Sequence, residues 1–301
     1  MRKLIPTTTP RLLLAAFLLL AAGAAMAQER ARIVAVNYPL AYFAERLAGD
    51  AAEVIYPVPE SVDPSFWRPA IADISTVQSA DLILLNGAGF ATWVDRVSLP
   101  RSKLVNSSDG LSDRFISTQS ITHSHGDGGE HSHEGTAAYT WLDPDLAIAQ
   151  AEAVARAMTA RGLAPADAVQ DRLDALRSEL ETLDAAAGDA LADAGTVPMI
   201  ATHPRYQYLA RAYGLDIAAL DWDAGATPDA DQLQALSDLA AERGARILIW
   251  EADPGAEAMT ATDELGLTSV VFPPLATPPE DGSYLEAFRA AVTALGTAAT
   301  P

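Results

Sequence analysis

Short apolar runs alternate with amphipathic stretches along most of the chain after residue 30. The apolar, partly β-branched runs predict strands over residues 31–36, 54–58 and 81–86. The stretches between and after them have helical periodicity over residues 38–47, 71–79 and 91–97. Strands that alternate with helices build a parallel sheet with helices on both faces. The first part of the chain is therefore predicted to be an α/β lobe.

The same alternation returns in the last third of the chain. It predicts strands over 197–201, 216–220, 246–250 and 269–272, and helices over 205–213, 229–243, 256–264 and 284–295. The alanine-rich stretches 145–161 and 166–194 lie between the two halves, and the second has apolar residues at spacings of three and four. A helix of that length suits a connection between two lobes.

The predicted organisation is therefore an α/β chain with two Rossmann-like lobes, each a mostly parallel sheet flanked by helices. We expect a signal peptide over 1–27, an N-terminal lobe over 28–165 that includes a segment at 119–135, a long connecting helix over 166–194 and a C-terminal lobe over 195–301.

The first 27 residues have the features of a secretory signal peptide. Basic residues precede the apolar run 12–22, and Ala25-Met26-Ala27 is a small-x-small site, so cleavage is predicted after Ala27. The run is shorter than the roughly 20 residues that a membrane-spanning helix needs, which argues against a membrane anchor. No cysteine follows it to carry a lipid. We expect a periplasmic protein that is not a lipoprotein.

Composition excludes several kinds of chemistry. The chain has no cysteine, so thiol nucleophiles, cysteine zinc sites and iron–sulfur clusters are excluded, and imidazole and carboxylate remain as strong metal ligands. Its 20 basic and 40 acidic residues give a net charge of −20, which argues against nucleic acid as a partner. Motifs of hydrolases, zinc proteases and phosphate loops are absent, and Gly87 and Gly89 are interpreted as a turn. A binding protein is therefore favoured over an enzyme.

Four of the five histidines lie in the segment 119–135. They are His123, His125, His131 and His133, which form two H-x-H pairs separated by acidic residues. The Gly, Ser and Asp content of this segment is typical of a mobile surface loop. Its imidazoles and carboxylates could enclose one zinc ion with modest affinity, because ordering the loop costs conformational entropy. The alternative is a solvated loop without a metal.

Several motifs resemble those of the solute-binding proteins that serve zinc and manganese ABC importers. They are VPESVDPSFWRP at 58–69, SADLILLNGAGFATW at 79–93, WLDP at 141–144, THPRYQY at 202–208 and IWE at 249–251. The motifs occur in the family's order through nearly the whole chain after the signal peptide. The chain thus resembles the periplasmic, zinc-type proteins of this group, cluster A-I.

This resemblance implies two α/β lobes joined by a rigid helix, with a metal held between them by about three histidines and a carboxylate. Three of the four ligand positions are replaced. Ser65 and Tyr139 stand where the family has its first two histidines, Pro273 stands where it has an aspartate, and only His203 is kept. One imidazole with two hydroxyl groups cannot hold Zn²⁺ tightly. The cleft site is therefore expected to be weak or lost.

Two residues near this expected cleft have alternative interpretations. His203 follows a predicted strand and opens a helix, so it could share an ion with the histidine-rich segment or be a partly buried, hydrogen-bonded histidine. Glu251 ends a predicted strand, where open α/β sheets place their ligands. It could act as a replacement carboxylate, but an ion pair with Arg205 or Arg68 is favoured.

Three functional hypotheses follow from these features. The first is an extracytoplasmic, monomeric zinc-binding protein for an ABC importer, which holds zinc through the histidine-rich segment with a contribution of His203 and serves a permease in the inner membrane. The second is a degenerate homologue whose cleft binds a small organic or anionic solute through Ser65, Tyr139, His203 and Arg205. The third is a periplasmic, metallochaperone-like interaction protein.

Overall fold

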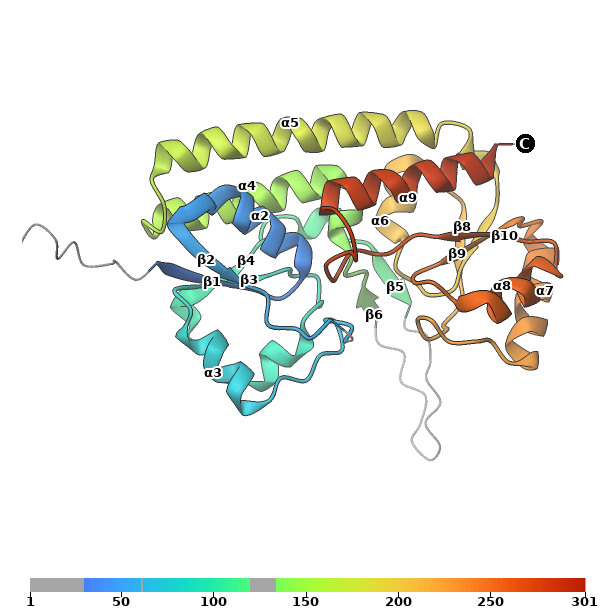
Figure 1. Ribbon diagram of the computed structural model, residues 1–301, viewed down its shortest axis with the longest axis horizontal. Coiled ribbons are helices and arrows are strands. Elements are labelled where there is room, and N and C mark those ends of the chain that lie inside the picture. Colours follow the sequence, from blue (N-terminus) through green and yellow to red (C-terminus); the bar gives the residue numbers. More distant parts are fainter. Residues whose placement is uncertain (1–29, 61, 120–133, 301) are drawn as a thin grey trace, which may run out of the picture. The chain divides into compact units, whose positions relative to one another are not determined.

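The computed structural model describes residues 30–60, 62–119 and 134–300. The chain divides after Arg30, and the residues from Ala31 onward form one compact unit, whose elements are labelled in Figure 1. The predicted signal peptide and the four histidines of segment 119–135 lie outside the described residues. Within the described ranges, no helix combines the length and the apolar character that crossing a membrane requires.

The first half of this unit contains a four-stranded parallel sheet in the order β2-β1-β3-β4. Its strands are β1 (Ala31–Ala35), β2 (Ala52–Ile55), β3 (Leu82–Leu85) and β4 (Leu104–Asn106). The side chains of β1 and β3 are apolar and mostly buried, as expected for central strands with both faces covered. Figure 1 shows α2 (Tyr38–Ala48) and α4 (Pro144–Ala160) on one side of this sheet and α3 (Ile71–Ser79) on the other.

The second half repeats this topology. Its parallel sheet has the order β10-β9-β7-β8. Counted from the opposite edge the order is β8-β7-β9-β10, which is the same arrangement of strands as β2-β1-β3-β4 in the first sheet. The strands are β7 (Met199–Ala201), β8 (Ile217–Ala219), β9 (Ile247–Trp250) and β10 (Thr268–Val271), and the helices are α6 (Gln207–Tyr213), α7 (Ala230–Arg243) and α8 (Gly255–Asp263). Each sheet therefore has a switch point, between β1 and β3 or between β7 and β9. Ligands of open α/β sheets bind beyond the carboxyl ends of strands at such points.

The long helix α5 (Ala166–Ala190) packs against elements of both halves. It contacts α2 and α4 of the first half and α9 (Tyr284–Ala299) of the second, as Figure 1 also shows. Its buried residues recur every three or four positions: Val169, Leu173, Leu176, Leu180, Leu183 and Ala187. One hydrophobic core extends from Ile33 in β1 to Leu295 in α9, so the two halves share a core.

The predicted fold class, an α/β chain with parallel sheets flanked by helices, is confirmed. Three local predictions need correction. Residues 91–97 contain only a 3₁₀ turn (Thr92–Arg96), because no side chain caps its start and the β-branched Thr92, Val94 and Val97 disfavour an α-helix. The predicted loop 119–135 is bordered by two strands, β5 (Ser117–Gln119) and β6 (Glu134–Thr136), which include its first and last residues. Helix α5 ends at Ala190, four residues earlier than predicted.

Candidate functional site

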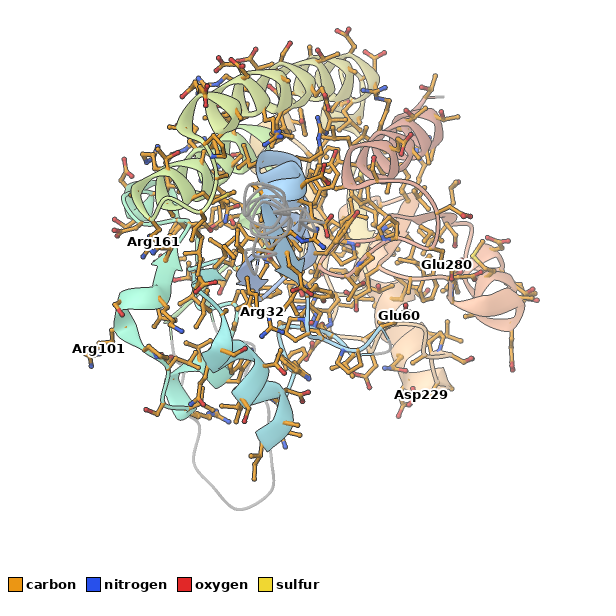
Figure 2. All side chains as sticks on the ribbon, turned by 60° about the vertical axis from the view of Figure 1, so that its left-hand side comes forward. Arg32, Glu60, Arg101, Arg161, Asp229 and Glu280 are labelled. Carbon is orange, nitrogen blue, oxygen red and sulfur yellow. The ribbon has the colours of Figure 1, made fainter. Side chains whose placement is uncertain are left out.

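A pocket of about 330 Å³ opens between loops of the two halves. The first half contributes residues of the loop after β2, together with Tyr139. Figure 2 labels Glu60, which lies on that loop and lines the pocket beside residues of the second half. The second half contributes Glu251 at the end of β9 and the proline-rich stretch 273–279 after β10. The pocket thus lies beyond the carboxyl ends of parallel strands, as the topology requires.

The guanidinium of Arg205 lies beside this pocket and binds carboxylates from both halves. Its Nη2 donates to Asp63 Oδ2 at 2.6 Å, and its Nε donates to Glu251 Oε2 at 3.1 Å. Ser65 Oγ is 3.5 Å from Nη1. Arg205 is only 6% exposed, so its ion pair with the buried Glu251 is shielded from water, whereas the Asp63 side chain is 34% exposed. Of the two ion pairs considered for Glu251, the structure has the one with Arg205.

Aromatic rings and neighbouring charges complete the surroundings of Arg205. The guanidinium carbon lies 4.6 Å from the centre of the Tyr139 ring, within the range of a cation–π contact. Burial lowers the pKa of Arg205, but Tyr139, Asp63 and Glu251 outweigh it and raise that pKa above its ordinary value. Burial also raises the pKa of the Tyr139 phenol well above its ordinary value. Tyr139 is therefore a neutral hydroxyl, which is a weak metal ligand.

Ser65, Tyr139 and Pro273, the three positions where the motif resemblance implies family ligands, all lie around this region. The hydroxyl and amide of Ser65 both donate to Asp63 Oδ1, at 2.6 and 2.8 Å, and so orient that carboxylate toward Arg205. Pro273 lines the pocket but has no polar side-chain atom. Leu275, two residues further on, has a φ of 58°, a strained conformation for a branched side chain.

His203 lies after β7 and its ring is held in a defined orientation. Its Nδ1 is 2.9 Å from the carbonyl oxygen of Trp222 and 3.5 Å from Asp221 Oδ1. Because a carbonyl oxygen only accepts, the neutral ring carries its proton on Nδ1 and leaves a lone pair on Nε2. Histidines that bind metals are oriented in this way by a second hydrogen bond. His203 is hydrogen-bonded, as one interpretation expects, and still able to act as a ligand.

The cleft residues do not form a zinc site by themselves. Among the residues that the structure describes, no group of three or more His, Cys, Asp or Glu side chains is close enough together to hold a metal ion. Asp63 and Glu251 line the pocket, but both bind Arg205. The donor set at this position therefore fits a fixed guanidinium rather than Zn²⁺.

The histidine-rich segment is framed by described strands. β5 and β6 pair in antiparallel fashion, with Ser117 opposite Thr136, so the chain enters and leaves residues 120–133 at neighbouring positions. One residue beyond β6, the carbonyl of Ala137 accepts a hydrogen bond from the Tyr208 hydroxyl at 3.0 Å. Tyr139 of the pocket follows two residues later. The base of the segment is thus connected directly to the pocket wall.

Sequence reasoning missed Asp63 and underestimated Arg205. Asp63 lies two residues before Ser65 in the motif at 58–69, and Arg205 lies two residues after His203. An arginine two residues after His203, near the positions where the motif resemblance implies ligands, was the available signal. The ion pair of Arg205 with Glu251 was among those expected, but its second partner, Asp63, could not be identified, because Asp63 and Arg205 are separated by 142 residues.

Comparison with known proteins identifies the family of this chain. The profile of the family described as zinc-uptake complex component A, periplasmic, matches residues 33–298. The zinc-binding lipoprotein AdcA of Streptococcus pneumoniae strain R6 is 26% identical over 274 residues, covering 87% of this chain and 54% of that protein. The high-affinity zinc uptake system protein ZnuA of Bacillus subtilis is 26% identical over 251 residues, covering 81% and 78%. The chain spans about half the length of the AdcA relatives that it matches.

Solved structures have the same fold. The metal-dependent lipoprotein YcdH of Bacillus subtilis and the Zn(II)-bound ZnuA-like domain of Streptococcus pneumoniae AdcA each superpose with a TM-score of 0.74 at 22% identity, covering 89% of this chain and 98% of theirs. The resemblance inferred from the motifs is therefore confirmed. The chain belongs to the family of periplasmic zinc-uptake components, the solute-binding proteins of metal ABC importers.

Proposed function

We propose that this chain is the extracytoplasmic solute-binding component of an ABC-type importer and that zinc is its cargo. The zinc is bound through the histidine-rich segment 119–135, by His123, His125, His131 and His133, with His203 contributing through Nε2. The protein acts in the periplasm after removal of residues 1–27 and delivers its cargo to a permease in the membrane. It is a transport protein with no catalytic step.

The observation that carries this proposal is the position of Arg205. Its guanidinium bonds Asp63 and Glu251 at the pocket, so zinc needs other donors. The four imidazoles of segment 119–135 are the largest remaining set of nitrogen donors, since the chain has five histidines and no cysteine.

The geometry of His203 supports its part in the proposal. The hydrogen bond from Nδ1 to the Trp222 carbonyl fixes the tautomer that a ligand needs, and the side chain is 15% exposed, so the ring is not sealed in the core. Two or three imidazoles from a segment anchored next to the pocket, together with Nε2 of His203, give the three to four donors that zinc requires.

Zinc calorimetry on the secreted form tests this assignment. We expect one bound ion in the intact protein. Replacing all four histidines of the segment by serine should abolish binding, and H203A should weaken it about ten-fold or more. A matched control replaces Ser124 and Ser132 by alanine in the same segment and keeps every imidazole, so its affinity should equal that of the intact protein. Unchanged zinc affinity without the four histidines would exclude the segment as the binding site.

The pocket supports a second candidate, the binding of a small organic solute in the cleft. Its volume of about 330 Å³ is within the range of small-molecule sites, and prolines provide apolar walls. Glu60, Asp63 and Glu251 line it, whereas the nearby Arg205 already bonds two of these carboxylates, so the charges favour a cationic or neutral solute over an anionic one. A thermal-shift screen separates the candidates, because a ligand raises the melting temperature by mass action. Stabilisation by organic cations and none by zinc would favour the second.

A further inference from the structure

Arg205 is surrounded by groups that would otherwise attract a bound cation. Three of its nitrogens face Asp63 Oδ2, Glu251 Oε2 and Ser65 Oγ, at 2.6, 3.1 and 3.5 Å. The face of the Tyr139 ring covers the guanidinium at 4.6 Å. Carboxylates in charge-assisted hydrogen bonds and an aromatic face are the surroundings that stabilise a buried positive charge.

These groups come from both walls of the pocket. Asp63 lies on the loop between β2 and α3, whereas Glu251 follows β9 and Arg205 lies between β7 and α6. The side chains of Arg205 and Glu251 are 8% and 7% exposed. A carboxylate at that depth is strongly destabilising without a positive partner. The two walls of the pocket, one from each half of the chain, are therefore joined by one cation, the guanidinium of Arg205, which bonds to carboxylates of both.

We propose that Arg205 is a built-in replacement for a cargo cation: its guanidinium supplies the positive charge of the cleft, joins the two walls without cargo and keeps divalent cations out. Because the charge is covalently part of the chain, Asp63 and Glu251 are neutralised at all times. A divalent cation at the same place would meet a like charge in surroundings that water screens poorly. This proposal goes beyond the zinc-binding function and does not depend on segment 119–135.

Thermal unfolding of R205M tests the proposal in the full secreted chain. We expect its melting temperature to fall by on the order of 10 °C, because two carboxylates lose their partner. Adding Mn²⁺ or Ca²⁺, which prefer oxygen ligands, should restore a large part of that loss. The control is R46M: Arg46 also binds a carboxylate twice, at 2.7 and 2.8 Å, but near the surface and far from the pocket. The melting temperature of R46M should fall only slightly. Mn²⁺ or Ca²⁺ should raise it no more than they raise that of the unaltered chain.

An R205M melting temperature equal to that of the unaltered chain, or an equal response of all three proteins to Mn²⁺, would overturn the proposal. The measurement is repeated with the four histidines of segment 119–135 changed to serine. Failure of the zinc proposal then leaves this result unaffected, because the Mn²⁺ response depends only on the carboxylates beside Arg205.

If R205M does not fold, D63N tests the link from the opposite wall. It removes one carboxylate and leaves Arg205 with Glu251. Amide hydrogen exchange should then become faster over residues 203–206, which belong to the other wall. The control is D73N, which removes the carboxylate that accepts from the Ala70 amide at 2.8 Å and should affect only the start of α3. Unchanged exchange over 203–206 in D63N would contradict the proposed link.

Discussion

The α-carbon of Gly296 in α9 faces the carbonyl oxygen of Ala190, the last residue of α5, with no side chain between them. A Cβ at Gly296 would overlap that oxygen. The two helices can therefore approach closely only because this position is glycine. Since α5 packs on the first half and α9 on the second half of the shared core, this contact helps to join the halves.

The variant G296A should be strongly destabilised. The new methyl group would displace backbone rather than a flexible side chain, so we expect a loss of about 2–3 kcal/mol or more in the free energy of unfolding. Urea unfolding measures it. The control is G188A in α5, where a Cβ meets nothing within 4 Å. Alanine there should stabilise the protein by roughly 0.5–1 kcal/mol, because glycine is a poor residue in a helix. Destabilisation of equal size in both variants would contradict this account of Gly296.

The ion pair between Arg46 in α2 and Glu179 in α5 predicts a pH-dependent contribution to stability. The hydrogen bonds from Arg46 lower the pKa of Glu179 below its ordinary value of 4.5. A carboxyl group whose pKa is lower in the folded state stabilises the protein above 4.5, and that contribution is lost as the pH falls through the folded-state pKa. Both side chains are partly exposed, so its size should be below about 1 kcal/mol.

Accordingly, E179Q should be less stable than the unaltered chain at neutral pH, and the two unfolding curves should converge in acid. The control is E181Q, an exposed glutamate on the same helix for which no ion pair is found among the described residues. It should follow the unaltered chain at every pH. A difference for E179Q that persists in acid would mean that the amide disturbs packing rather than removing a charge.

Gln150 in α4 is the centre of a buried polar network behind the cleft. Its Nε2 donates to Asn86 Oδ1 and Ser107 Oγ at 3.0 and 2.9 Å, and its Oε1 accepts from Thr140 Oγ1 at 3.1 Å. Thr140 directly follows Tyr139 of the pocket. The network therefore fixes the loop that carries the Tyr139 ring.

The variant Q150L should lose about 2–4 kcal/mol in the free energy of unfolding, because it leaves several buried polar groups without partners. The matched control is Q234L, which removes the exposed hydrogen bond to Asp238 in α7 and should change stability by less than about 0.5 kcal/mol. Chemical denaturation compares the two. A small effect of Q150L would show that the network reorganises or admits water.

Local sequence signals account for most of the fold but not for the chemistry of the cleft. The helix Ile71–Ser79 has the predicted bounds, although only Val77 of its residues is buried. The strand Leu104–Asn106 was missed, because its only apolar residues, Leu104 and Val105, are too few to form a recognisable pattern. The bonding of Arg205 to Asp63 depends on how two loops from different halves meet, which no local pattern encodes.

Back-substitution of the cleft tests whether Arg205 opposes metal binding at the positions where the motif resemblance implies ligands. Placing histidine at Ser65 and Tyr139 and aspartate at Pro273 restores, beside His203, the ligand types that the motif resemblance assigns to these positions. With Arg205 retained, zinc should still bind poorly, because unit charges of like sign 4 Å apart repel by roughly 4 kcal/mol even at an effective dielectric of 20. Adding R205A to the same three changes should therefore tighten zinc binding by at least about a hundred-fold. Calorimetry in a chain whose segment 119–135 carries serine for histidine isolates the cleft. Equal zinc affinity with and without Arg205 would show that the guanidinium does not oppose zinc binding in this cleft.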